Sequence, residues 1–330
     1  MSTILVTGVA GLLGSHLSKH FISLGHKVIG VDNLSGGYEE YVPPGVKFYE
    51  VDLVDNESLE GIFETEKPDY VYHFAAYAAV GLSPFIRRFN YTNNVIASVN
   101  LINASINHDV KKFIFTSSMD VYGENQVPYT EEMIPRPEDP YGIAKYAIEQ
   151  DLWAAHDQFG LKYAIVRPHN VVGTYQNIWD KYRNVIGIWL RKTLNGEPIT
   201  IYGDGTQVRS FSDIRFYMEP FASLLYDHDG EVFNIGADQY CSINELADAF
   251  QEVAQECGYV TEREYLEARH EVHTAYCDHT KAKNMLGFKD ETNLRELVKD
   301  MFVWAKGEPN RKVKLMPYEI EKNMYSYWKK

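Results

Sequence analysis

The chain has 330 residues, of which 45% are hydrophobic and 24% charged, and its formal net charge at pH 7 is −14. The acidic balance without a long basic run argues against nucleic acid and anionic membrane surfaces as partners, and no apolar run approaches the ~18 residues of a membrane span. The cysteines at 241, 257 and 277 lack metal-type spacing, so we expect no metal site, reduced thiols and a cytoplasmic protein without a secretory signal.

A glycine-rich turn between a predicted strand and a predicted helix comes first. Residues 4–7 form a short apolar, β-branched run, glycines follow at 8, 11 and 14, and residues 15–24 have a helical pattern. Gly8 permits a tight turn, Gly11 lets the backbone approach a pyrophosphate, and Gly14 lets the helix pack on the strand. The next strand, residues 27–31, ends in Asp32, and an acid ~20 residues after the glycines is placed to bind the adenosine ribose. The pattern predicts an NAD site rather than an NADP site, with a structural turn and a solvated acid as the alternative.

Further strands follow at regular intervals, with helices between them. The predicted strands are residues 46–51, 70–74, 113–116 and 162–167, and the predicted helices are residues 58–64, 90–106 and 140–156. This alternation predicts an α/β fold with a Rossmann-type, doubly wound parallel sheet, in which ligands bind beyond the carboxyl ends of the strands. The residues that fall at such ends are Gly8, Asp32, Asp52, Ala75 and Ser118. Asp52 is placed either to reach the adenine amino group or to cap the helix at 58–64.

Tyr141 and Lys145 lie four residues apart in the predicted helix at 140–156. This spacing puts both side chains on one helix face. An ammonium near a phenol favours the ionised phenol, which makes Tyr141 a candidate proton acceptor near neutral pH. An isolated pair of this kind is more often an ordinary surface pair, so its interpretation depends on the other motifs.

The second half of the chain has a weaker alternation of predicted strands and helices. We predict helices at 185–194, 243–256, 280–286 and 294–306, a strand at 198–202, and a strand at 232–235 that returns to the main sheet. The predicted division is an NAD-binding domain at 1–170, joined by later segments at about 207–240, and a smaller mixed α/β substrate-binding cap, mainly 171–330. Residues 310–330 receive no functional interpretation.

Several motifs occur together and in one order along the chain. They are Gly8, Gly11 and Gly14, then Asp32, Ser117-Ser118, the Tyr141 and Lys145 pair, and Arg167-Pro168-His169-Asn170. This combination resembles the extended short-chain dehydrogenase/reductases. Within them the chain looks like the NAD-dependent nucleotide-sugar epimerases and dehydratases, of the UDP-glucose 4-epimerase type. The resemblance covers nearly the whole chain.

The resemblance implies roles for individual residues. Tyr141 would take the proton of a sugar hydroxyl while hydride passes to NAD⁺, and Lys145 would bind the nicotinamide ribose and lower the tyrosine pKa. Ser118, with Ser117 as the alternative, would hydrogen-bond the same sugar oxygen. The implied cofactor contacts are Gly8, Gly11, Leu12, Leu13, Asp32, Asn33, Asp52, Leu53, Ala75, Ala76, Asn94, Ser117, Tyr141, Lys145 and Pro168. The implied substrate contacts are Tyr77, Ser118, His169, Asn170, Asn184, Arg209 and Arg269.

Two of these residues have ordinary structural interpretations as well. Asn94 could be a helix-surface amide, and Arg269 could be a surface ion-pair residue. The helices around Asn94 and Tyr141 form a bundle interface in the family, so the resemblance also implies a homodimer.

The implied reaction is 4-epimerisation of a nucleotide hexose, with UDP favoured, through a transient 4-keto sugar and bound NADH. The related 4,6-dehydratases carry an adjacent Asp-Glu pair after the serine or threonine, where this chain has Met119 and Asp120. The missing first acid argues against dehydration. Asp120 leaves three alternative functions, a 4-dehydrogenase, a decarboxylase or a 3,5-epimerase, because that position supplies an extra acid or base in such enzymes. A non-catalytic NAD-binding regulator is the alternative from a different functional class.

Overall fold

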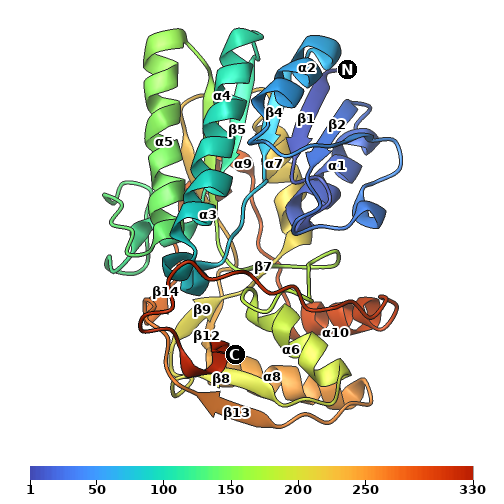
Figure 1. The fold of residues 1–330 in the computed structure, drawn as a ribbon, viewed down its shortest axis with the longest axis vertical. Coiled ribbons are helices and arrows are strands. Elements are labelled where there is room, and N and C mark those ends of the chain that lie inside the picture. The colour runs from blue at the N-terminus through green and yellow to red at the C-terminus, as the bar shows by residue number, and fades with distance from the viewer. Residues whose placement is uncertain (330) are drawn as a thin grey trace.

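A seven-stranded parallel sheet forms the upper part of the computed structural model, which describes residues 1–329 (Figure 1). The strands lie in the order β11-β6-β5-β4-β1-β2-β3. Their bounds are β1 (Thr3–Thr7), β2 (Lys27–Asp32), β3 (Lys47–Glu50), β4 (Tyr70–His73), β5 (Lys112–Thr116), β6 (Tyr163–Pro168) and β11 (Val232–Ile235). The order reverses between β1 and β4, which is where open α/β sheets bind ligands. The predicted Rossmann-type fold class is confirmed.

Helices cover both faces of this sheet, which explains why its central strands are apolar on both sides. One face is covered by α1 (Leu12–Ser23), α7 (Met218–Ser223) and α9 (Thr280–Leu286), and the other by α2 (Asn56–Glu66), α4 (Ala97–Asn107) and α5 (Pro140–Phe159). Phe21 and Phe221 pack on the first face, and Leu101 and Leu152 on the second, all of them fully buried.

The helix predicted at 90–106 consists of three pieces. They are α3 (Arg87–Tyr91), a π-helical turn (Thr92–Ile96) and α4. The wide turn contains Asn94, whose side-chain oxygen accepts a hydrogen bond of 2.8 Å from the backbone N–H of Tyr77. Such turns are uncommon and often occur next to functional sites. Apolar periodicity cannot reveal them, because the neighbouring helical turns keep the same pattern.

The lower part of the molecule is the cap. Its helices are α6 (Val185–Leu194), α8 (Ile243–Glu256) and α10 (Leu294–Ala305). Its strands are β8 (Ile199–Tyr202) paired with β13 (Arg263–Leu266), and β9 (Val208–Ser210) between β12 (Tyr240–Ser242) and β14 (Thr274–Ala275). A further pair, β7 (Val171–Val172) and β10 (Ser212–Asp213), lies between the two parts. The core of the cap contains the buried rings of Trp189, Phe250 and Phe302.

The chain after α10 crosses the front of the molecule as an extended segment, from α10 past α3 to the C-terminus beside β8 (Figure 1). We call residues 307–329 the strap. Among residues 1–329, no helix is both long and apolar enough to cross a membrane.

Candidate active site

A single cavity of about 530 Å³ extends between the carboxyl ends of the central strands and the cap. It is lined by every residue that the sequence analysis assigned to cofactor, substrate or catalysis, with the exception of Asn94. Residues more than 200 positions apart, such as Gly8 and Arg269, thus meet around one space. The parallel sheet causes this convergence because all its strands end at the same edge.

The three glycines of the first turn form a narrow cradle. Gly8 has a φ of +69°, and a Cβ atom on it would lie 2.8 Å from the backbone nitrogen of Ala75. A Cβ atom on Gly14 would lie 2.2 Å from the carbonyl oxygen of Gly8. Any side chain at these two positions would therefore collide with backbone. The cradle opens onto the N-terminus of α1, which suits the phosphates of a dinucleotide.

Two carboxylates lie at the ends of β2 and β3. Asp32 is 9% exposed and accepts hydrogen bonds from the backbone N–H groups of Ala10, at 3.0 Å, and Leu34, at 2.8 Å. Burial raises its pKa. Asp52 accepts a hydrogen bond of 2.9 Å from the side chain of Asn33. The capping interpretation of Asp52 is wrong, because Asp55 is the residue that caps α2.

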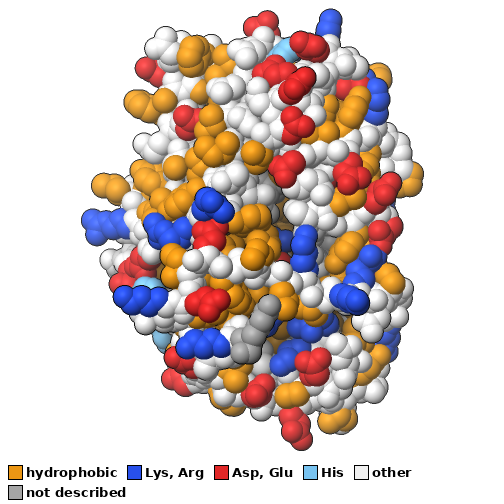
Figure 2. Space-filling view, in the orientation of Figure 1, with side chains coloured by type: hydrophobic (Ala, Val, Ile, Leu, Met, Phe, Trp, Pro, Cys, Tyr) orange, Lys and Arg blue, Asp and Glu red, His pale blue; other side chains and the backbone are white. Residues whose placement is uncertain are grey.

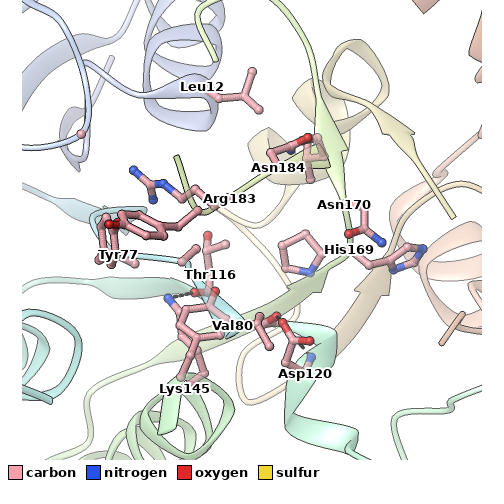
Figure 3. Close-up of a pocket in the computed structure, with 18 of the residues that line it drawn as sticks. Leu12, Tyr77, Val80, Thr116, Asp120, Lys145, His169, Asn170, Arg183 and Asn184 are labelled. Carbon is pink, nitrogen blue, oxygen red and sulfur yellow. Dashed lines mark hydrogen bonds between the residues drawn. The ribbon is translucent and has the colours of Figure 1, made fainter. Parts of the chain in front are cut away.

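Tyr141 and Lys145 lie one turn apart at the start of α5. Asp139 caps this helix, accepting hydrogen bonds from the backbone N–H groups of Tyr141, at 2.8 Å, and Gly142, at 3.2 Å. The Lys145 ammonium lies 5.9 Å from the centre of the Tyr141 ring and donates a hydrogen bond of 2.7 Å to the carbonyl oxygen of Thr116 (Figure 3). The N-cap residue Asp139 and the first turn of α5 thus hold both side chains against the cavity.

The pKa of Tyr141 moves in the direction opposite to our prediction. Burial raises the pKa of Tyr141, and the nearby charge of Asp120 raises it further. Burial also lowers the pKa of Lys145 to about 7. The prediction failed because desolvation of the phenol outweighs attraction to the ammonium, which faces the carbonyl oxygen of Thr116.

Ser118 and Asp120 form a hydrogen-bonded pair beside Tyr141. The Ser118 hydroxyl donates to the Asp120 carboxylate at 2.7 Å. Burial raises the pKa of Asp120. Burial, and then the charge of Asp120, raise the pKa of Asp139 to about 6. The site therefore contains two neighbouring carboxyl groups that retain protons more readily than exposed ones do.

The two adjacent serines differ in their partners. The Ser117 hydroxyl donates to Glu149 at 2.5 Å within a buried network. The Ser118 hydroxyl instead lies within hydrogen-bonding reach of the Tyr141 phenol. This difference favours Ser118 over Ser117 as the residue that would meet a sugar oxygen.

Four polar side chains lie on the cap side of the cavity. Arg209 donates to the carbonyl oxygens of Val208, at 2.8 Å, and His273, at 2.9 Å. The side-chain nitrogen of Asn184 lies 3.2 Å from the carbonyl oxygen of Val171, and that of Asn170 lies 2.9 Å from the carbonyl oxygen of Ser210. The fourth side chain, Arg269, is surrounded by aromatic rings.

His169 and Asn94 do not direct their side chains as the resemblance implies. The His169 ring stacks 5.0 Å from that of His279 and packs against Gly236, and Figure 3 shows it pointing away from Lys145. Burial lowers the pKa of His169 to about 3, so the ring is neutral. Asn94 holds the backbone of Tyr77 through both of its amide atoms. Asn94 thus supports the wall of the cavity from behind, whereas His169 lines the cavity with its ring turned away from Lys145.

Several lining residues were not predicted from the sequence, and Arg183 and Asp139 are two of them. Arg183 donates to Asp180 at 2.9 Å, and its guanidinium lies 4.7 Å from the centre of the Tyr77 ring. It lies just before α6, outside every motif that the sequence analysis identified. Asp139 is the other, and its place directly before the Pro140-Tyr141 helix start is a capping signal that could have identified it.

Comparison with known proteins gives one consistent group. Residues 4–236 match the model of the NAD dependent epimerase/dehydratase family. The UDP-glucose 4-epimerase of Halalkalibacterium halodurans is 32% identical over 326 residues, covering 93% of this chain and 96% of the relative. The UDP-glucose 4-epimerase of Thermotoga maritima, solved with UDP-glucose, is 37% identical with a TM-score of 0.86, covering 92% of this chain and 98% of that one. The UDP-glucose 4-epimerase of Thermus thermophilus, solved with NAD, is 29% identical with a TM-score of 0.86. The match covers 92% of this chain and 99% of that one.

Proposed function

The chain belongs to the NAD dependent epimerase/dehydratase family, and on this premise we propose that it is an enzyme that catalyses 4-epimerisation of a UDP-hexose with a retained NAD. One observation carries the proposal. The glycine cradle, the group Ser118, Tyr141 and Lys145, and the arginines of the cap line one continuous cavity. The names of the relatives support the choice of a UDP-sugar.

The proposed cofactor fits the residues present. Gly8 and Gly14 leave room where a side chain would collide with backbone, and Asp32 offers a fixed carboxylate to a ribose. Gly8, Gly14 and Asp32 would hold NAD⁺, which would supply the hydride acceptor that oxidation at C4 of the sugar requires. The chain's own part is to hold the proton. Tyr141 accepts it from the C4 hydroxyl as the C–H bond breaks and gives it back when the bond re-forms.

The other residues of the site have supporting roles in this proposal. Ser118 donates a hydrogen bond to the C4 oxygen, and the charged form of Lys145 favours the ionised phenol. Arg209 and Arg269 provide cations for the diphosphate, which tethers the sugar while its ring turns over. The sugar contacts Tyr77 and Asn184, which both line the cavity.

Asp120 supports a second candidate function. Its half-buried carboxyl group lines the cavity and accepts a hydrogen bond from Ser118. A 4-keto sugar has acidic hydrogens at C3 and C5, and a carboxylate at this place could remove one of them. The second candidate is therefore a 3,5-epimerase, a decarboxylase or a 4-dehydrogenase acting on the same class of substrate.

Proton NMR separates the two candidates. The purified protein would be given UDP-glucose, UDP-galactose, UDP-glucuronate and GDP-mannose in turn, in heavy water and without added NAD. We expect gluco and galacto signals to interconvert, with no deuterium entering the sugar and no net NADH. Deuterium at C3 or C5, loss of carboxylate, or stoichiometric NADH would establish the second candidate. A protein with full NAD content that changes none of the four sugars would contradict both.

We further propose a homodimer formed through α4 and α5. The support is a set of exposed apolar side chains, with Ile96, just before α4, 48% exposed, and Ile143 and Trp153 on α5 41% and 60% exposed. Trp153→Glu places a charge in the proposed interface and should convert a dimer into a monomer in sedimentation at micromolar concentration. Val260→Glu, at an 87% exposed site in the cap, is the matched control and should remain dimeric. A monomeric wild-type protein would overturn this proposal.

The division into an NAD-binding domain at 1–170, with about 207–240, and a cap at 171–330 also remains our proposal. The main sheet supports the division, since six of its strands come from residues 3–168 and the seventh from 232–235, although β9 (Val208–Ser210) lies in the cap. We also propose a cytoplasmic location, for which the three free cysteines give support.

A further inference from the structure

The first part of the strap attaches the cap to the loop after β2. The carboxylate of Glu308 accepts a hydrogen bond of 2.5 Å from the Tyr41 hydroxyl. Arg311 pairs with Glu40, and its guanidinium lies 3.8 Å from the centre of the Tyr38 ring. These contacts extend from the end of α10 to the half of the molecule that contains the glycine cradle.

The middle of the strap is fixed to the first turn of α3 and to Phe85, just before that helix. The Glu319 carboxylate accepts hydrogen bonds from the backbone N–H groups of Arg88, at 2.7 Å, and Phe89, at 2.8 Å. The backbone N–H of Glu319 donates to the carbonyl oxygen of Phe85 at 2.8 Å. The Tyr318 and Tyr182 hydroxyls lie 2.9 Å apart. The strap therefore follows a specific course, fixed by paired polar groups on both sides of the cavity.

The last residues of the strap enter an aromatic cluster. Trp328 is 1% exposed and packs edge-on against the rings of Phe85, at 5.9 Å, and Tyr182, at 5.3 Å. Figure 2 shows hydrophobic side chains gathered at the middle of this face, where the strap crosses. Tyr182 lines the cavity, so Trp328 lies directly behind its wall.

Arg269 lies between this cluster and the cavity. Its guanidinium carbon is 3.5 Å from the centre of the Tyr202 ring, 4.9 Å from Trp328 and 5.8 Å from Tyr327. Its Nε donates to the Tyr327 hydroxyl at 3.4 Å. Its Nη2 atom is buried and has no hydrogen-bond partner among residues 1–329. Such a donor is costly to bury unless a partner arrives.

Arg209 differs from Arg269 in its partners. Arg209 has a carboxylate, that of Glu271, at 3.3 Å. Among the residues that the structure describes, no carboxylate pairs with Arg269, which is held by aromatic rings and by its hydrogen bond to the Tyr327 hydroxyl. Aromatic faces can hold a guanidinium in place without neutralising its charge. Arg269 is thus a fixed cation at the cavity wall whose charge remains available to an anion.

We propose that the strap positions Arg269 for an anionic ligand, and that Trp328 is the positioning residue. The ligand class is a diphosphate, and its identification with the diphosphate of a UDP-sugar rests on the proposed function. Trp328 does not touch the ligand. It fixes the plane of the guanidinium from behind, so that the unpartnered Nη2 donor is fixed before the ligand arrives.

The test is a double-mutant cycle read as UDP affinity by calorimetry. Trp328→Leu keeps much of the volume and removes the ring face, and it should weaken UDP binding about ten-fold. Arg269→Ala should weaken it by at least as much, because a charged donor is lost. The double variant should bind no worse than Arg269→Ala alone. Trp328→Phe should restore most of the affinity, and Lys322→Ala, an exposed position on the strap, should leave it unchanged.

NAD content and the thermal midpoint of each variant identify a merely structural effect. If Trp328→Leu weakens UDP binding equally with and without Arg269, the residue acts through general stability and the proposal is wrong. Unchanged affinity in Trp328→Leu would also overturn it. Inorganic pyrophosphate serves as a second probe. Wild-type protein that binds pyrophosphate through Arg269 but does not bind UDP would support the inference and contradict the proposed function. Binding of neither would contradict both.

Discussion

Replacement of Tyr141 by phenylalanine is expected to lower the turnover number by about 100- to 10,000-fold, the usual contribution of a positioned acid–base group. The substitution removes one oxygen atom from a side chain that is 6% exposed and leaves the ring packing intact. The backbone at this position is fixed by Asp139, and the contact of Lys145 with Thr116 does not involve the phenol oxygen. The loss should therefore appear in the turnover number, with the affinity for UDP and the NAD content unchanged.

Tyr146→Phe is the matched control for this variant. Tyr146 lies on the same helix and packs into the cluster around Tyr122, away from the cavity lining. It should keep wild-type turnover. Turnover would be followed by NMR of the UDP-sugar, and reduction of the bound cofactor by its absorbance in a single turnover. A Tyr141→Phe protein that still reduces its cofactor at the wild-type rate would remove Tyr141 from the proposed mechanism and leave Ser118 and Asp120 as the proton acceptors to test.

Replacement of Glu149 by alanine is expected to destabilise the protein by about 3–5 kcal/mol, as breaking a buried ion pair does. The Arg167 and Glu149 side chains are only 5% and 4% exposed. They form a bidentate ion pair, in which Nε of Arg167 donates to Oε1 of Glu149 at 2.9 Å and Nη2 donates to Oε2 at 2.5 Å. The Ser117 hydroxyl donates to the same carboxylate, and Arg167 also donates to the Tyr122 hydroxyl at 2.7 Å. Loss of Glu149 would leave the arginine charge and the serine hydroxyl without their acceptor.

The urea and thermal midpoints of Glu149→Ala would measure this loss. The informative control is the double variant Glu149→Leu with Arg167→Met, which removes both charges and fills the space. It should be more stable than Glu149→Ala, because no uncompensated charge remains. If the double variant is the less stable of the two, the pair itself stabilises the fold, and the cost of an isolated buried charge is not the cause.

Much of the fold could be predicted because its signals are local. The strand β5 has all five residues buried and contains the apolar run predicted at 113–116. The helix α6 begins and ends where the sequence indicates, at Val185 and Leu194. The glycines at 8 and 14 are required by backbone contacts between adjacent elements. In each case the residues that show the sequence pattern are the same residues whose burial or backbone contacts require it.

The remaining features depend on contacts between distant residues. The strand β13 has the burial pattern of a half-exposed edge, and its pairing with β8 gives no local signal. The short helix α7 has only six residues and was likewise not predicted. The direction of the His169 ring depends on Gly236 and His279, and the surroundings of Arg269 depend on the strap. Spacing placed these residues at the site but could not indicate which way their side chains turn.

The strand β11 makes the main sheet discontinuous in sequence. Val232 to Ile235 pair with Ile165 to Pro168, so the edge of β6 is covered only by chain made some sixty residues later. Phe233 and Ile235 are both fully buried. A fragment that stops at the end of β6 would therefore leave a long apolar edge open, which favours aggregation. The contact order of the sheet is high, and the cofactor half cannot complete its fold before the first part of the cap has been synthesised.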